Sequence, residues 1–186
     1  MPISTEEAAE ALKSIALVQR RASILRGYER GAPHVILWGL IWVVGYGLSD
    51  VVPSTAGPIW LVLNVVGVAG SFLLGRAAVV GVPMAGEGYG RRFAALSAAM
   101  LAFILATYYV MKPRDADQFG AFPALLVATI YTVLGIWRGA RWAVSGVVLG
   151  VCTVAGFALF KEHFMLWMAA VGGSTLLVTG FWLRRE

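Results

Sequence analysis

Six long apolar runs dominate the sequence and decide what this chain can fold into. Each contains about 20 residues, which is the length of helix that crosses the hydrocarbon core of a bilayer. The runs cover 33–52, 58–80, 93–111, 119–137, 142–160 and 164–183. None of them alternates with the period of two that a half-buried strand requires. The sequence therefore predicts an all-α integral membrane bundle of six transmembrane helices.

The overall composition also favours a membrane protein over a soluble domain. Apolar residues make up 59% of the 186 residues and charged residues only 13%, about half the charged share of a soluble protein. The basic residues stand at the ends of the apolar runs and form no basic stripe with exposed aromatic residues, which argues against nucleic acid as a partner. The single cysteine, Cys152, can form neither an intramolecular disulfide nor a CxxC metal site. We expect the lipid bilayer as a partner, and neither a metal nor a cofactor.

The distribution of lysine and arginine predicts the orientation of the six spans. Short cytoplasmic loops of membrane proteins carry an excess of these residues. With both termini inside a bacterial-type inner membrane, the outside loops hold only Lys112, Arg114 and Lys161. The other twelve basic residues are then inside: Lys13, Arg20, Arg21, Arg26, Arg30, Arg76, Arg91, Arg92, Arg138, Arg141, Arg184 and Arg185.

The segment before the first apolar run has the pattern of an amphipathic helix. Ser4 or Thr5 followed by Glu6 and Glu7 is typical of a helix start, and we expect Gly31 and Pro33 to end the helix. Residues 1–31 would then be an N-terminal helix at the cytoplasmic face, and residues 32–186 the transmembrane domain. Five basic residues of this helix are expected to contact anionic lipid headgroups: Lys13, Arg20, Arg21, Arg26 and Arg30.

Aromatic residues recur every four positions along the first apolar run. Trp38, Trp42 and Tyr46 fall on one slowly drifting helix face, and a tryptophan near the bilayer midplane is unusual because tryptophan favours the interfaces. Together with the polar Asn64 and Ser71 of the second run, these rings are candidates for the wall of a cavity that binds a small ligand. The alternative is that the rings fill the bundle core or face lipid.

Small residues also recur at intervals of four, and such stripes let helix backbones approach closely in lipid. They are candidates either for packing within the bundle or for contact with a second subunit or partner. The third run carries Ala94, Ala98, Ala102 and Ala106, and the fifth carries Gly146 and Gly150.

No motif in the sequence indicates catalysis. His34 and His163 would lie at opposite membrane faces, so neither can serve as a base for Ser174 deep in the sixth run. In size and number of spans the chain is similar to the substrate-binding subunits of energy-coupling-factor transporters. Those subunits carry an alanine motif on the first span, whereas the alanine stripe here is on the third, so no residue role is carried over. We expect a protein that is not an enzyme.

Two functions fit these features. The first is a non-catalytic module, acting as an oligomer or with a partner subunit, that binds or passes a small neutral or lipid-like molecule. The second is an accessory or regulatory subunit that docks a partner through its N-terminal helix and small-residue faces. A cavity behind Trp42 would favour the first function. A solid core with an exposed Leu17 and Ile24 face would favour the second.

Overall fold

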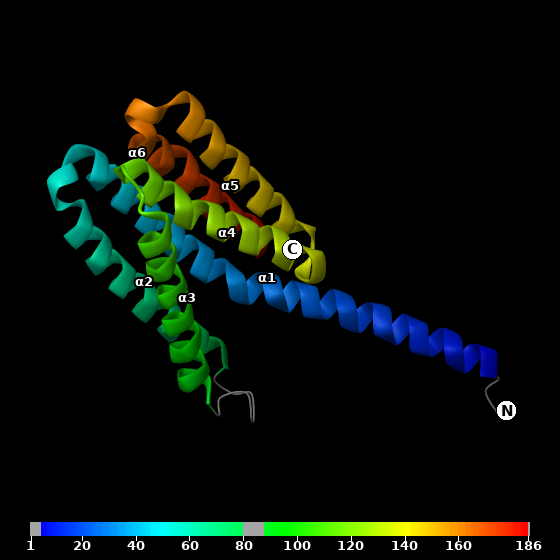
Figure 1. Ribbon diagram of the computed structural model, residues 1–186. Coiled ribbons are helices and arrows are strands. Elements are labelled where there is room, and N and C mark those ends of the chain that lie inside the picture. The colour runs from blue at the N-terminus through cyan, green and yellow to red at the C-terminus, as the bar shows by residue number, and fades with distance from the viewer. Residues whose placement is uncertain (1–4, 80–87, 186) are drawn as a thin grey trace.

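The computed structural model describes residues 5–79 and 88–185, and within them every regular element is helical (Figure 1). Residues 1–4 of the expected N-terminal helix and residue 80 of the second expected run lie outside the described residues. The long helices are α1 (Thr5–Val51), α2 (Ala56–Val79), α3 (Tyr89–Met111), α4 (Ala116–Arg138) and α5 (Ala140–Leu159). The last run is divided into α6 (Phe164–Trp167), the π-helical turn η3 (Met168–Gly172) and α7 (Gly173–Arg184), and two short 3₁₀ turns are η1 (Pro53–Thr55) and η2 (Lys161–His163).

The six expected runs coincide with six helical segments that are long and apolar enough to cross a membrane. Apart from the first segment, which begins well before Pro33, the segments begin and end where charged, proline or glycine residues interrupt the apolar sequence. Asp115 begins α4, for example, because its side chain accepts a hydrogen bond of 2.8 Å from the backbone N–H of Gln118. The predicted all-helical bundle is therefore confirmed, with six helices that are long and apolar enough to span a membrane.

The expected break at Gly31 and Pro33 is wrong, because α1 continues through both residues. Pro33 has no N–H to donate to the carbonyl of Glu29, a defect worth about 3 kcal/mol in an isolated helix. Packing on both sides of the proline offsets this cost: Ala32 and Val35 are fully buried. Gly31 does not end the helix. It leaves room for the ring of Trp142, since a Cβ at this position would lie 2.4 Å from that ring.

The bundle is built around the C-terminal half of α1. This half packs against α7, against the short α6–η3 segment and against α2, while α4 and α5 form a closely packed hairpin beside it (Figure 1). The N-terminal half of α1 runs clear of the other helices and ends far from the bundle. The helix α3 meets its neighbours much less and has no buried residue among those described.

Two helix pairs approach each other through glycine. A Cβ on Gly146 of α5 would lie 2.4 Å from the backbone nitrogen of Thr132 in α4, so only glycine permits this contact. A Cβ on Gly180 of α7 would lie 2.4 Å from the side chain of Ile36 in α1. In lipid, where helices gain little from the hydrophobic effect, such close approaches provide the van der Waals contact that holds a bundle together.

One end of the bundle gathers α1, the α4–α5 turn and the C-terminus (Figure 1). Arg141 joins them: its guanidinium donates hydrogen bonds to the carbonyl oxygens of Trp182 and Arg185, and it lies 5.1 Å from the ring centre of Tyr28. A cation at the last carbonyls of a helix is favoured by the helix dipole. Arg141 is therefore a structural residue that fastens α5 to the ends of α1 and α7.

Candidate functional site

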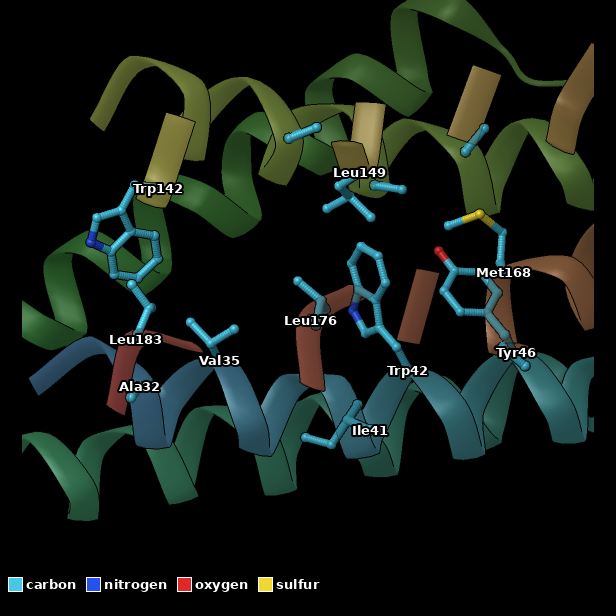
Figure 2. Close-up of a cluster of buried hydrophobic side chains, with 14 of the residues drawn as sticks. Ala32, Val35, Ile41, Trp42, Tyr46, Trp142, Leu149, Met168, Leu176 and Leu183 are labelled. Carbon is cyan, nitrogen blue, oxygen red and sulfur yellow. The ribbon is translucent and has the colours of Figure 1, made fainter. Parts of the chain in front are cut away.

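The aromatic stripe of α1 lies in the packed core. Trp42 is only 4% exposed and Tyr46 only 2%, and their rings meet edge to face with centres 5.5 Å apart. Figure 2 shows both rings pointing into a cluster that includes Leu149 of α5 and Met168 of the π-helical turn. The hydroxyl of Tyr46 donates a hydrogen bond of 2.7 Å to the carbonyl of Gly120, which ties α1 to α4.

Trp38 and Ser71 are brought together, whereas Asn64 is not. The indole N–H of Trp38 donates to the hydroxyl oxygen of Ser71 at 3.1 Å, which links α1 to α2. Asn64 is exposed, and its amide donates to the carbonyl of Trp60 in its own helix. The five residues predicted to wall a cavity therefore do not converge on one space.

Trp60 and Ser49 complete this cluster, and sequence reasoning did not single out either of them. The indole N–H of Trp60 donates to the hydroxyl of Ser49 at 3.0 Å, and the ring lies 4.9 Å from that of Tyr46. The indole N–H groups of Trp38 and Trp60 and the hydroxyl of Tyr46 thus each have a partner on a neighbouring helix. Such bonds suit a core that holds helices together, because an unpaired polar group in an apolar interior is costly.

Two surface hollows in the described part of the chain both lie away from Trp42. One, of about 350 Å³, lies between the end of α3 and the start of α4 and is lined by Tyr108, Lys112 and Phe122 among others. The other, of about 390 Å³, lies between α1 and the end of α4. Neither of these hollows supports a ligand cavity behind the aromatic stripe.

The two groups of small residues have different surroundings. The alanine stripe on α3 is exposed along its whole length and points away from the bundle core: Ala94, Ala98, Ala102 and Ala106. In contrast, Gly146 and Gly150 both face Ala128 of α4. The two glycines thus pack against another helix of the same chain, whereas the four alanines are exposed on the outer face of α3.

The N-terminal half of α1 exposes both its charges and its apolar side chains. The five basic residues predicted to contact lipid headgroups are all exposed: Lys13, Arg20, Arg21, Arg26 and Arg30. Leu17 is exposed as well, whereas Ile24 is partly covered and its side chain lies near Gly139 in the α4–α5 turn. The covered part of α1 therefore begins near Ile24, and the helix before it has no neighbour among the described residues that buries it.

Arg26 and Arg30 have a third arginine beside them that sequence reasoning did not associate with them. Together with Trp137 and Arg138 at the end of α4, they line the hollow of about 390 Å³, which we call the arginine hollow. The only sequence signal was that Trp137 and Arg138 end an apolar run. Their proximity to Arg26 depends on how α4 packs against α1.

The chain matches no protein-family model, no curated protein and no solved structure. Its class rests on the fold itself. Six apolar helices of spanning length, packed around one central helix, support a multi-pass helical membrane protein.

Proposed function

We propose that this protein is an accessory membrane subunit whose N-terminal half of α1 binds an acidic helical segment of a cytoplasmic partner. The six-helix bundle anchors this docking helix in the inner membrane, with both termini on the cytoplasmic side, as the twelve-to-three distribution of basic residues favours. The observation that carries the proposal is the continuity of α1, which runs from Thr5 to Val51 without interruption. At 1.5 Å per residue, Val18 lies about 22 Å beyond Pro33 along the helix axis.

An apolar seam runs along this part of α1. Ala11, Ile15, Val18, Ala22 and Leu25 follow one another at intervals of four, three, four and three residues, which is the spacing that pairs two helices in a coiled coil. We call these five residues the docking seam. It is rotated roughly 100° around the helix axis from the face that packs into the bundle. Ile15 is 51% exposed and Val18 67%, so the seam is available to another helix.

The charges around the docking seam favour an acidic partner over a second copy of the chain. Residues 11–30 contain five basic residues and one acidic residue, a net charge of +4. In a parallel pair of identical helices, Arg21 of one chain would face Arg26 of the other across the seam, and like charges at these flanking positions oppose pairing. An apolar helix flanked by Asp and Glu would instead match both the seam and the charge.

The ligand-binding function has less support. Of its predicted wall residues, Trp42, Tyr46 and Ser71 are buried in the bundle and Asn64 is exposed on α2, and the two hollows lie at the surface. Leu17 is exposed, as a docking helix requires, but Ile24 is partly covered near Gly139, so the expected face of Leu17 and Ile24 supports the docking function only through Leu17. We also propose that the protein has no catalytic activity of its own, because its aromatic and hydroxyl groups are occupied in packing and hydrogen bonds between helices.

A photoreactive amino acid placed at Ile15 or Val18 in intact cells should form a covalent adduct with a cytoplasmic protein. The cross-linked peptide of that protein should have apolar residues at the spacing of an amphipathic helix. It should also be rich in Asp and Glu, because the seam is flanked by arginine. The same group at Leu61, which is exposed on α2, should give no such adduct. The measurement is immunoblotting followed by peptide mapping of the adduct.

Charge reversal provides the discriminating control. Arg20→Glu combined with Arg21→Glu should abolish the adduct, while Arg91→Glu combined with Arg92→Glu, the same change on α3, should leave it unchanged. An adduct with the mass of two copies of this chain would show that the docking seam binds a second copy and not an acidic partner. An adduct that survives reversal at Arg20 and Arg21 would contradict an acidic partner, and an extracytoplasmic adduct would contradict the orientation.

A further inference from the structure

The arginine hollow has the composition of a site for a phosphate group. Three arginines, Arg26, Arg30 and Arg138, line one space of about 390 Å³ between α1 and α4. Each guanidinium offers five N–H donors in a planar fork that matches phosphate oxygens. The hydroxyl proton of Ser23, which also lines the hollow, is donated to the carbonyl of Arg20 at 2.8 Å, so the arginines are the available donors.

None of these three arginines forms an ion pair with another described residue, although Glu29 lies between Arg26 and Arg30 in the sequence of α1. The one ion pair in the described part of the chain joins Lys161 to Asp115 on the other side of the bundle, at 3.8 Å. Arg141 lies near by, but its guanidinium is held by the carbonyls at the end of α7. Three like charges around one hollow repel each other, and a bound anion relieves that repulsion.

Trp137 adds information about the height of the site relative to the membrane. It is the residue before Arg138 at the end of α4, and its side chain is 70% exposed although it is large and amphipathic. Tryptophan in such a position is typical of the boundary between lipid tails and headgroups. The guanidinium groups of the arginine hollow would then lie at the level of the lipid phosphates.

We propose that the arginine hollow binds a phosphate group, supplied by the headgroup of an anionic phospholipid or by free phosphate in the cytoplasm. The position of Trp137 favours the phospholipid, because lipid phosphates and basic pockets between helices at the cytoplasmic face meet at this depth. Phosphate binding at this site does not depend on a protein partner, although Arg26 also flanks the docking seam. The site deepens the expected headgroup contact of Arg26 and Arg30 by adding Arg138 and an open hollow between α1 and α4.

Native mass spectrometry of the full-length protein in detergent, titrated with phosphatidylglycerol or phosphatidylcholine, tests the site. The triple variant Arg26→Gln, Arg30→Gln, Arg138→Gln should bind phosphatidylglycerol about 100-fold more weakly, and each single variant about 5-fold more weakly. Binding of phosphatidylcholine should not change. The control Arg91→Gln, Arg92→Gln, Arg184→Gln removes the same charge from exposed positions elsewhere and should retain the affinity.

Two further experiments identify the source of the phosphate and distinguish a loss of binding from a loss of folding. Inorganic phosphate that displaces phosphatidylglycerol, with the same dependence on the three arginines, would identify free phosphate as the ligand. Lysine at all three positions should restore most of the binding, since the charge remains, and its thermal unfolding should match that of the parent. Equal loss of affinity in the control triple variant, or no loss in the arginine-hollow variant for either ligand, would overturn the proposal.

Discussion

Replacing Gly146 with leucine is expected to prevent α4 and α5 from packing and to destabilise the bundle by about 3 kcal/mol, the upper end of the usual range for overpacking. The new Cβ would lie 2.4 Å from the backbone nitrogen of Thr132 and 2.5 Å from the carbonyl oxygen of Ala128. These are backbone atoms of a regular helix, so they cannot rotate away as a side chain would. The helices must separate, and the contact that joins them in lipid is lost. Unfolding by heat in detergent micelles measures the effect.

Gly57→Leu is the matched control for this change. It makes the same substitution in α2, at a position where a Cβ would meet nothing within 4 Å. Its effect should stay within about 0.5 kcal/mol, as for most surface substitutions. Similar losses for both variants would show that the close approach of α4 and α5 does not carry the stability assigned to it.

Trp42→Ala should cost roughly 3–5 kcal/mol, the usual range for truncating a buried aromatic side chain. Trp42 touches the core cluster of α1, α5 and the last span, and its edge-to-face contact with Tyr46 would also be lost. The cavity left behind is lined by apolar groups that cannot close over it fully. Thermal unfolding in detergent provides the measurement.

Trp137→Ala removes the same side chain from an exposed position and should change stability in lipid-free detergent by no more than about 0.5 kcal/mol. A second readout distinguishes core from cavity. If Trp42→Ala leaves stability intact but changes which small molecules co-purify, the aromatic stripe walls a ligand site after all. A large stability loss with unchanged small-molecule content agrees with the packed core.

The number and limits of the apolar spans could be predicted from sequence because they depend on local properties. About 20 consecutive apolar residues are sufficient for a membrane-crossing helix, and charged or proline residues interrupt the runs at the ends. The continuity of α1 depends on something else. Pro33 weakens the helix locally, but Trp142, more than 100 residues later in the chain, packs over Gly31 and holds the helix together. No local pattern contains that contact.

For the candidate sites too, the spacing of residues along a helix could be predicted from sequence, but the packing between helices could not. The interval of four residues correctly placed Trp38, Trp42 and Tyr46 along one side of α1, yet it could not show that this side faces the core. Trp60 became part of the cluster only because α2 folds back on α1. Likewise, the alanine stripe of α3 and the pair Gly146 and Gly150 have the same spacing, but one is exposed and the other packs against α4.

The docking proposal requires that α1 remain one straight helix through Gly31 and Pro33 when the protein is in a bilayer. A distance between spin labels at Ser14 and Val51, both exposed, measures this directly in nanodiscs with Cys152→Ser as background. A continuous helix predicts a narrow distribution centred at about 55 Å, from 37 residues at 1.5 Å each. A helix that turns at Pro33 by a right angle to lie on the membrane surface would give about 40 Å. A distribution at this shorter distance would contradict the account, because the docking seam would then face lipid and not a cytoplasmic partner.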